Sequence, residues 1–359
     1  MRVLVVNAGS STLKLALISE SDELEGSTLL EAPYDDRAVR GALAQLDGAH
    51  AVGHRVVHGG ERFTAAAPID EAVLESLREL GELAPLHQPP ALAALEIVSA
   101  ALPDLPAVAC FDTAFHATLG AAARTYALPA DWRERWPLWR FGFHGLSHAW
   151  VARRAPELAG DSPAARIVSC HLGAGASLCA IASGRSVDTT MGFTPLEGLV
   201  MATRSGDVDP GLVLWLAGRL SPSELATGLE HESGLLGLAG SADMRTVLAR
   251  AGDGDERAVL ALDVYSHRLR AGIAAMAASL GGMDVLAFTG GVGEHAPEVR
   301  ARAAADLEFL GVAIDPAANR SAASDANISA ADASVQTVVV SAREDLEIAR
   351  QTREALLLR

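Results

Sequence analysis

The stretch V-V-N-A-G-S-S-T-L-K-L-A-L-I, residues 5–18, predicts two apolar strands joined by a polar turn. Two residues such as Asn-Gly are enough to join a pair of strands. This turn is longer and carries several groups that can donate hydrogen bonds, namely Asn7, Gly9, Ser10, Ser11 and Thr12. Gly and Ser are small, so backbone N–H groups can approach the oxygens of an anion closely. We therefore interpret the turn as a candidate phosphate site.

Lys14 lies just inside the second of these strands and is the only lysine among 29 lysine and arginine residues. In a chain so strongly biased to arginine, a lysine beside the polar turn suggests a compact ammonium group whose shape matters. A contact to phosphate is the favoured interpretation. A solvated strand residue is the alternative.

A second segment, I-V-S-C-H-L-G-A-G-A-S-L-C-A-I over residues 167–181, repeats the plan of strand, small turn and strand. Aligning Gly9 with Gly173 suggests an internal duplication. Two such turns facing one cleft could hold a polyphosphate from both sides. Each turn alone is a weak signal, because most glycine-rich turns are only turns.

The segment V-L-A-F-T-G-G-V-G-E-H-A-P-E-V-R, residues 285–300, predicts a buried strand, a glycine-rich turn and a helix opening near Pro297. A nucleotide could lie here against bare backbone at the helix N-terminus. The spacing is neither the G-x-G-x-x-G of a Rossmann first turn nor the G-x-x-x-x-G-K-S/T of a P-loop. Both of those sites are therefore disfavoured.

The composition predicts a globular protein of two domains, because 359 residues, of which 50% are hydrophobic, can bury a large core. A net charge of −16 argues against nucleic acid or an anionic membrane as a partner, since both call for a basic surface. The run over residues 271–291 predicts a buried helix and strand rather than a membrane span, because Gly281, Gly282 and Asp284 interrupt it.

The cysteines indicate the compartment. Cys110, Cys170 and Cys179 are odd in number, lie in apolar surroundings and lack metal-ligand spacing, which is typical of a reduced, cytoplasmic protein. The apolar run near the first strand is too short for a secretory signal, so we expect a cytoplasmic location.

Four further segments place charged or histidine side chains near the expected ends of strands. Arg55 lies in G-H-R-V-V-H-G-G-E, and Asp112 follows a buried strand in A-C-F-D-T-A-F-H. His144 lies in F-G-F-H-G-L-S-H and Arg204 in M-A-T-R-S-G-D-V-D-P. Taken singly, each has a plainer structural explanation. Together with three glycine-rich turns, they are what transfer of a phosphoryl group to a small anion requires.

In its sequence motifs the chain resembles the acetokinase family, within the superfamily of acetate and sugar kinases, Hsp70 and actin. The matching motifs run through the chain in family order: N-A-G-S-S-T-L-K, G-H-R-V-V-H-G-G-E, P-L-H-Q-P, F-D-T-A-F-H, F-G-F-H-G-L-S-H, H-L-G-A-G-A-S, T-P-L-E-G-L-V-M-A-T-R-S-G-D-V-D-P, D-M-R, F-T-G-G-V-G-E-H and R-E-D-L-E-I-A. The resemblance implies an α/β protein with a duplicated ribonuclease H-like, actin-like ATPase fold. Each of its two domains would be a mixed sheet flanked by helices, with the active site between the domains. The first domain would comprise residues 1–116 and 346–359, and the second residues 117–345.

The same resemblance implies an enzyme that transfers the γ-phosphoryl group of ATP to acetate reversibly, giving acetyl phosphate and ADP. Asp112 would be the acid/base carboxylate, and His144 and Arg204 would stabilise the transition state. Arg55 would bind the acetate carboxylate. Mg²⁺, or Mn²⁺ in its place, would be held by Asn7 and Glu344. The family also implies a homodimer.

Two sets of binding residues follow from the resemblance. The nucleotide and its phosphates would contact Ser10, Thr12, Lys14, His171, Leu172, Gly173, Ala174, Gly175, Asp243, Met244, Arg245, Gly291, Val292, Gly293, Glu294 and His295. The methyl group of acetate would lie in a pocket of Val57, Leu86, Phe143 and Pro195.

The chain also departs from the family pattern. Ala174 and His295 stand where the family usually has Asn, Leu146 replaces a common Thr, and Ala202 replaces a common Gly. The segment before the G-H-R-V-V-H motif is shorter than usual. Propionate or butyrate as acceptor, pyrophosphate as donor, and a nucleotide-binding relative without catalytic activity therefore stay open as alternatives.

Overall fold

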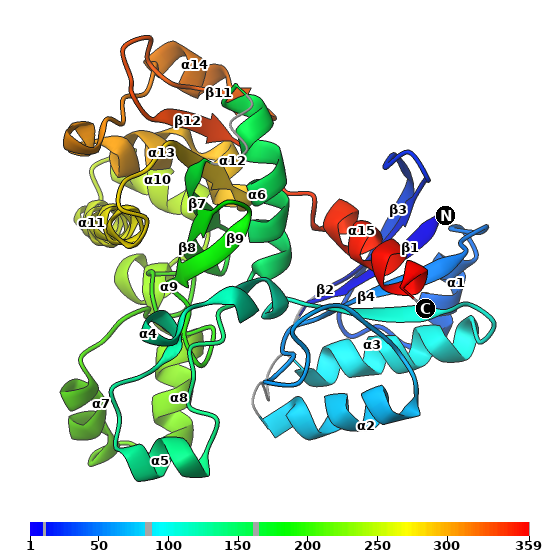
Figure 1. Cartoon of the computed structure of the whole chain (residues 1–359). Coiled ribbons are helices and arrows are strands. Elements are labelled where there is room, and N and C mark those ends of the chain that lie inside the picture. The colour runs from blue at the N-terminus through cyan, green and yellow to red at the C-terminus, as the bar shows by residue number, and fades with distance from the viewer. Residues whose placement is uncertain (10–11, 83–87, 161–164, 359) are drawn as a thin grey trace. The chain divides into compact units, whose positions relative to one another are not determined.

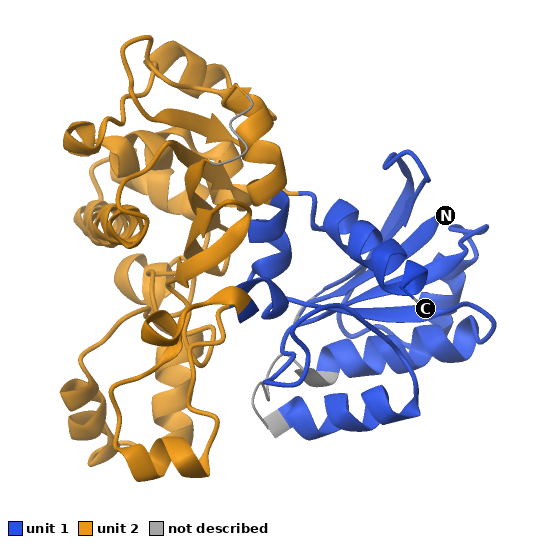
Figure 2. Ribbon diagram, in the orientation of Figure 1, with its two compact units in different colours: residues 1–117, 143–150, 343–359 blue, residues 118–142, 151–342 orange. Residues whose placement is uncertain are grey.

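The computed structural model describes residues 1–9, 12–82, 88–160 and 165–358, and these residues form two compact units. Unit 1 comprises residues 1–117, 143–150 and 343–359 (Figure 2). Unit 2 comprises residues 118–142 and 151–342. The C-terminal segment therefore belongs to the same unit as the first strands. The domain bounds given above stay a prediction.

Unit 1 is built on a six-stranded mixed sheet in the order β3-β2-β1-β4-β6-β5. Its strands are β1 (Val3–Ala8), β2 (Thr12–Ile18), β3 (Leu24–Glu31), β4 (Ala51–Val56), β5 (Ala67–Pro68) and β6 (Ala107–Phe111). β1 and β2 are antiparallel, as are β2 and β3, whereas β4 runs parallel to β1 and β6. The two apolar strands predicted on either side of the first turn are confirmed as β1 and β2.

Helices cover both faces of this sheet, because its central strands are apolar on both sides. The helices are α1 (Asp36–Leu43), α2 (Glu71–Glu79), α3 (Gln88–Ala101) and α15 (Glu344–Leu357), with a 3₁₀ turn at Leu80–Glu82 and another at Ala114–Thr118. Leu4 and Val6 of β1 belong to the core beneath α1 and α3. Val3 and Val5 alternate with them and pack on the other face, with Ile348 of α15. Figure 1 shows α15 on the opposite side of the sheet from α3.

α15 lies close against the sheet because β4 has a glycine beneath it. A Cβ at Gly53 would lie 2.3 Å from Thr352 Oγ1 and 2.7 Å from Ile348 Cγ2. Real Cβ atoms do not approach other atoms so closely, so any side chain at Gly53 would displace the helix or its side chains. The first residue of the G-H-R-V-V-H motif therefore serves helix packing.

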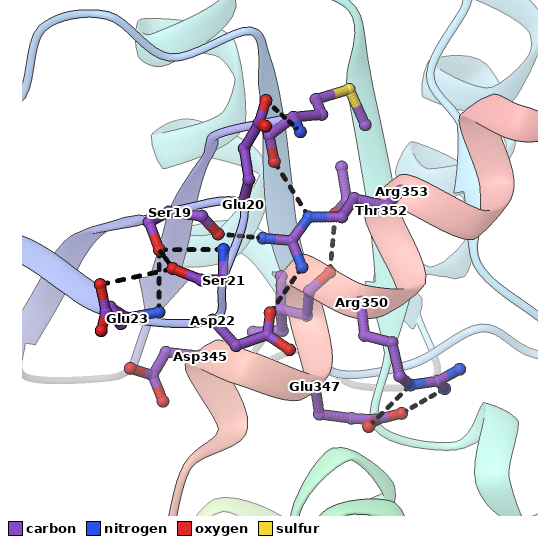
Figure 3. Close-up of polar contacts among 12 residues, drawn as sticks. Ser19, Glu20, Ser21, Asp22, Glu23, Asp345, Glu347, Arg350, Thr352 and Arg353 are labelled. Atoms are coloured by element: carbon purple, nitrogen blue, oxygen red, sulfur yellow. Dashed lines mark hydrogen bonds and ion pairs between the residues drawn. The ribbon is translucent and has the colours of Figure 1, made fainter.

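The far end of α15 is held by Arg353. Its guanidinium donates hydrogen bonds to the carbonyl oxygens of Met1 at 3.0 Å and Ser19 at 2.6 Å, and to the Asp22 carboxylate at 2.6 Å (Figure 3). These groups lie at the start of β1 and in the turn between β2 and β3. α15 is thus fixed to the N-terminal hairpin as well as to the core.

Unit 2 repeats the plan of unit 1. Its sheet has the order β11-β12-β10-β7-β8-β9. The strands are β7 (Arg166–Leu172), β8 (Ala176–Ala182), β9 (Arg185–Thr189), β10 (Val285–Thr289), β11 (Ala326–Asn327) and β12 (Gln336–Val339). β7, β8 and β9 are antiparallel neighbours, and β10 runs parallel to β7 and β12. Taken from β9 to β11, the strands of this sheet follow the same succession of antiparallel and parallel pairs as the strands of unit 1 from β3 to β5. This match confirms the predicted duplication.

The helices of unit 2 pack on this sheet or extend from it. They are α4 (Ala121–Arg124), α5 (Ala130–Arg135), α7 (Pro210–Ala217), α8 (Pro222–His231), α9 (Gly234–Ala239), α10 (Met244–Gly252), α11 (Glu256–Ser279), α12 (Gly290–His295), α13 (Pro297–Ala304) and α14 (Pro316–Ser321), with a 3₁₀ turn at Glu308–Leu310. α6 (Gly145–Leu158) begins in unit 1 and ends in unit 2. None of the helices within the described ranges is both long and apolar enough to cross a membrane.

The glycine-rich segment after β10 differs in part from its prediction. The helix opening at Pro297 is confirmed as α13, but the glycines before it form the short helix α12 rather than an open turn. Gly290 has φ of +79°, and a Cβ there would lie 2.8 Å from the Leu172 carbonyl oxygen. Glycine is required at this point because the chain turns from β10 into α12 directly against the end of β7.

Candidate functional site

Three side chains at the ends of unit 1 strands and one at the start of α15 form one hydrogen-bonded series. Arg55 Nε donates to both Asp112 carboxylate oxygens at 3.2 and 3.1 Å, and Arg55 Nη2 donates to Asp112 Oδ2 at 2.6 Å. Arg55 Nη1 donates to Asn7 Oδ1 at 3.1 Å. Asn7 Nδ2 in turn donates to Glu344 Oε2 at 3.3 Å. The structure therefore brings together four residues that the sequence singled out from four separate motifs.

The geometry follows from the sheet. Asn7 lies in β1, Arg55 in β4, and Asp112 directly after β6, and these three strands are parallel neighbours. The carboxyl ends of parallel strands meet at one edge of a sheet, where ligands bind in many α/β proteins. Glu344 reaches the same edge as the first residue of α15.

Burial and neighbouring charges shift the pKa values of the ionisable groups in this series. The Asp112 side chain is only 1% exposed. Its burial raises the pKa of Asp112; the guanidinium of Arg55 opposes this shift, and the charge of Glu344 adds to it. Burial disfavours the charge on Arg55, but the carboxylates of Asp112 and Glu344 outweigh this and raise the pKa of Arg55. The site thus holds a permanent cation beside a carboxyl group that binds a proton more readily than usual.

The F-G-F-H-G motif contacts the same strand end. Gly145 N–H donates to the Asp112 carbonyl oxygen at 2.8 Å, and a Cβ at Gly145 would lie 2.1 Å from that oxygen. His144 precedes this glycine and has a φ of +57°, which is uncommon for a residue with a side chain. The close backbone approach places His144 next to Asp112 within unit 1.

The first polar turn closes with a hydrogen bond from Gly9 N–H to the Thr12 carbonyl oxygen at 2.8 Å. Lys14 pairs with Asn7 across the β1 and β2 strands and its side chain is exposed. Lys14 therefore lies on the strand that leaves the turn, beside the hydrogen-bonded series. The candidate phosphate contact Ser10 falls outside the described residues.

The predicted methyl pocket is described only in part. Phe143 is buried, with its ring centroid 5.5 Å from that of His58 in an edge-to-face arrangement. Val57 directly follows β4 and is half-buried. Leu86 falls outside the described residues. Pro195 belongs to unit 2, on the loop that follows β9.

Unit 2 contains a cavity of about 400 Å³. Eight of the residues predicted to contact the nucleotide line it: Gly173, Ala174, Asp243, Met244, Arg245, Gly291, Val292 and His295. They come from the turn after β7, the start of α10 and the helix α12. Its size and largely apolar, small-residue lining suit a flat organic group.

The other predicted nucleotide residues support these walls. His171 and Leu172 end β7, and Gly173 N–H donates to the Gly175 carbonyl oxygen at 3.0 Å to close the turn. The carbonyl oxygens of Gly293 and Glu294 in α12 accept hydrogen bonds from Arg300 at 2.8 and 2.7 Å. These residues shape the cavity without lining it.

Six cavity residues were not predicted to contact the nucleotide, and two of them, Ala202 and Ala242, lie on loops. Leu235, Leu248, Tyr265 and Ala296 lie on or beside helices, and each lines the cavity. They are apolar or aromatic residues in helical patterns, which are indistinguishable from core positions in a sequence. The Tyr265 hydroxyl, which is buried, has no hydrogen-bond partner within the described parts of the chain.

Arg204 lies in unit 2, on the loop that precedes α7. Its Nη1 donates to the Pro195 carbonyl oxygen at 3.3 Å and lies 3.9 Å from Met201 Sδ. Burial lowers the pKa of Arg204, and the charge of Glu230 partly opposes this. Both of these contacts join the guanidinium to neutral atoms.

A divalent cation suits the oxygens of unit 1. Within the described ranges, no three His, Cys, Asp or Glu side chains are grouped as a metal site. Asn7 and Glu344 nevertheless carry an amide oxygen, which accepts from Arg55 Nη1 in this structure, and a carboxylate, and both are the hard oxygen ligands that Mg²⁺ prefers. Mg²⁺ keeps several waters and is usually held by one or two protein groups together with substrate phosphates, so this donor set fits it.

Comparisons with known proteins agree with one another. The model of the acetokinase family matches residues 35–350. The chain is 41% identical to an acetate kinase of Syntrophomonas wolfei, over 98% of this chain and 99% of the relative, and 43% identical to one of Coprothermobacter proteolyticus, over 99% and 98%. Among solved structures, an acetate kinase of Porphyromonas gingivalis has a TM-score of 0.90 at 36% identity, covering 99% of both chains. A propionate kinase of Francisella tularensis has a TM-score of 0.91 at 34% identity, covering 98% and 99%.

Proposed function

The chain belongs to the acetokinase family, and on that premise we propose that it is an acetate kinase that moves the γ-phosphoryl group of ATP to acetate. A carboxylate oxygen of acetate attacks the γ-phosphorus, the bond to the β,γ-bridging oxygen breaks, and ADP leaves with acetyl phosphate as the product. The reverse transfer uses the same groups. Acetate and ATP are thus the partners that we propose for the protein.

The observation that carries this proposal is the buried pair of Arg55 and Asp112. Both substrates are anions, so their approach is opposed by charge repulsion that a permanent cation must offset. We assign Arg55 to the acetate carboxylate and Asp112 to acid/base chemistry, because burial makes the latter's protonation state adjustable. His144 and Arg204 stabilise charge on the phosphoryl group during transfer.

The cavity of unit 2 supports a nucleotide donor. Its walls of glycine and alanine allow a planar base to lie against backbone, and Asp243 and Arg245 supply the polar side chains at the rim. Lys14 contacts the phosphates from the first hairpin. When bound, Mg²⁺ neutralises phosphate charge, and Asn7 and Glu344 hold it, directly or through water. Mn²⁺ takes the same ligands.

Trapping acyl phosphate as its hydroxamate tests the activity. The purified protein is incubated with Mg²⁺ and ATP or pyrophosphate, and with acetate, propionate or butyrate. We expect product with ATP and the highest kcat/KM with acetate. Preference for propionate would favour the activity named for the Francisella tularensis relative. Well-folded protein that binds ATP and forms no hydroxamate from any acid would overturn the proposal in favour of a nucleotide-binding relative without catalytic activity.

We also propose a cytoplasmic homodimer. In α7, which the structure describes in full, no residue is buried, and Leu214 and Trp215 are 75% and 55% exposed. Apolar side chains gathered in this way are typical of a covered surface, and a second copy of the chain is the partner we assign. Sedimentation velocity should give a dimer, and Leu214→Lys should shift it to monomer. A monomeric wild-type protein would contradict this assignment.

A further inference from the structure

Glu197 lies at the centre of a polar cluster in unit 2 that the proposed chemistry does not use. Its carboxylate accepts hydrogen bonds from the Tyr126 hydroxyl and from Arg140 Nη2. The Tyr126 oxygen also accepts a hydrogen bond from Phe193 N–H at 2.9 Å. Burial and the hydrogen bond to Glu197 raise the pKa of Tyr126, so its hydroxyl stays protonated and donates. We call residues 191–198 the Glu197 loop.

Arg140 fixes the start of the Glu197 loop. Its Nη1 donates toward three successive carbonyl oxygens, those of Thr189, Thr190 and Met191, at 3.3, 3.1 and 3.2 Å. These residues lead from the end of β9 into the loop. Because Nη2 of the same guanidinium reaches Glu197, one side chain ties the entry of the loop to its far end.

Gly192 shows how tightly the loop encloses this carboxylate. A Cβ at Gly192 would lie 1.6 Å from Glu197 Oε2 and 2.1 Å from the Tyr126 hydroxyl oxygen. Only glycine leaves room for both oxygens at that point. The backbone of the loop is therefore folded directly over the Tyr126 and Glu197 contact.

The Glu197 loop in turn holds Arg204. Pro195, inside the loop, supplies the carbonyl oxygen that accepts from Arg204 Nη1 at 3.3 Å. At the end of the loop, Gly198 N–H donates to Asp207 Oδ1 at 2.8 Å, and Asp207 N–H donates to the Gly198 carbonyl oxygen at 2.9 Å. The segment that carries Arg204 is thus hydrogen-bonded to the loop at the arginine itself and at Asp207, which follows it.

We propose that Glu197, held by Tyr126 and Arg140, is a positioning residue for Arg204 in phosphoryl transfer. The proposal rests on the proposed function, which assigns Arg204 to the transition state. Glu197 touches no substrate; it fixes the loop whose Pro195 carbonyl oxygen orients the guanidinium. Misplacing a catalytic group by about 1 Å can cost about 100-fold in rate, so loss of the carboxylate should lower kcat and leave nucleotide affinity unchanged.

Two variants test the positioning role of Glu197, and both are compared with one matched control. Glu197→Gln keeps the size of the side chain and removes its charge, and Tyr126→Phe removes only the hydroxyl. Asp284→Asn is the control, because Asp284 likewise binds an arginine of unit 2, Arg166, at 2.6 Å and lies far from the loop in sequence. Melting temperature, kcat, and KM for ATP and for acetate are measured on the full chain by the hydroxamate assay.

We expect kcat to fall by about 10-fold to 100-fold in both test variants, with KM for ATP unchanged, and to stay near the wild-type value in Asp284→Asn. Adding Glu197→Gln to Arg204→Ala should cause no further fall, because the group being positioned is already absent. Normal kcat in both test variants, or a full additional fall in the double variant, would overturn the positioning role alone. A wild-type protein that forms no hydroxamate would instead overturn the proposed function, and this role with it.

Discussion

Replacing Arg55 by methionine should destabilise unit 1 in a way that depends on pH. The substitution keeps the length of the apolar stem and removes the guanidinium, which makes three contacts of 2.6 to 3.2 Å to Asp112 and one of 3.1 Å to Asn7. The Asp112 side chain would then be a buried carboxylate without its cation. Breaking a buried pair in this way costs about 3 to 5 kcal/mol.

The sign of the pH dependence follows from the pKa of Asp112. Burial already raises it above its ordinary value of 3.8, and Arg55 is the group that opposes this rise. In Arg55→Met the folded protein therefore binds a proton at a higher pH than the unfolded chain does. Between those two pKa values the folded state holds more protons, so the free energy of unfolding decreases as pH rises. The variant should be closest to wild type at acid pH and weakest near pH 8.

Urea denaturation of the wild-type protein and the variant at pH 5 and pH 8 measures the pH dependence of the free energy of unfolding. Four of the five tryptophans, Trp132, Trp136, Trp139 and Trp215, belong to unit 2, so fluorescence reports mainly on that unit, whereas circular dichroism reports on both. We expect the variant to shift the circular dichroism transition and to shift it more at pH 8. Arg353→Met is the control, since its acidic partner Asp22 is exposed. An equal loss of stability at both pH values in Arg55→Met would refute the assignment of a buried, uncompensated Asp112.

Three predictions concern activity. Lys14→Ala should raise KM for ATP by about 10-fold or more, because a charged hydrogen bond is lost. An equal rise in KM for ATP and in KM for acetate would mean that Lys14 does not contact the nucleotide. Arg204→Ala should lower kcat by orders of magnitude, whereas Arg55→Ala should also raise KM for acetate; near-normal kcat in the former would remove Arg204 from the transition state. Ala174, whose carbonyl oxygen accepts from Ala202 N–H at 3.1 Å, lines the nucleotide cavity. Ala174→Asn adds a donor there and should raise kcat several-fold with little change in KM; an unchanged or lower kcat would show that the cavity has adapted to alanine.

Much of the fold was predictable because its signals are local. The apolar strands around the two hairpins, the buried helix before β10 and the helix at Pro297 are each marked by a run of side chains or by a turn residue within a few positions. The repeated hairpin also predicted the duplication that the two sheets display. The helix α12 was not predicted, because its six residues include three glycines, which have a low helix propensity.

The candidate site was predictable where motifs carry it and unpredictable where packing does. Arg55 and Asp112 were singled out by type and position, and the structure places them in contact. Tyr126, Arg140 and Glu197 were not singled out, although Glu197 lies within a quoted motif. The contacts of Tyr126 and Arg140 with Glu197 span 71 and 57 residues of sequence, and the steric demand at Gly192 appears only when Tyr126 and Glu197 are in place. A pattern of residues along the chain carries no trace of such contacts.

The place of α15 in unit 1 has a consequence for how the protein is made. A ribosome completes residues 151–342 of unit 2 before it reaches α15, although the strands of unit 1 precede unit 2 in the chain. Until residues 344–357 follow, the apolar face formed by Val3, Val5 and Cys110 lacks the cover that Ile348 and Ala349 of α15 provide. Unit 1 therefore cannot be completed before α15 is synthesised, and a nascent chain that stalls before α15 would present this face to chaperones and proteases.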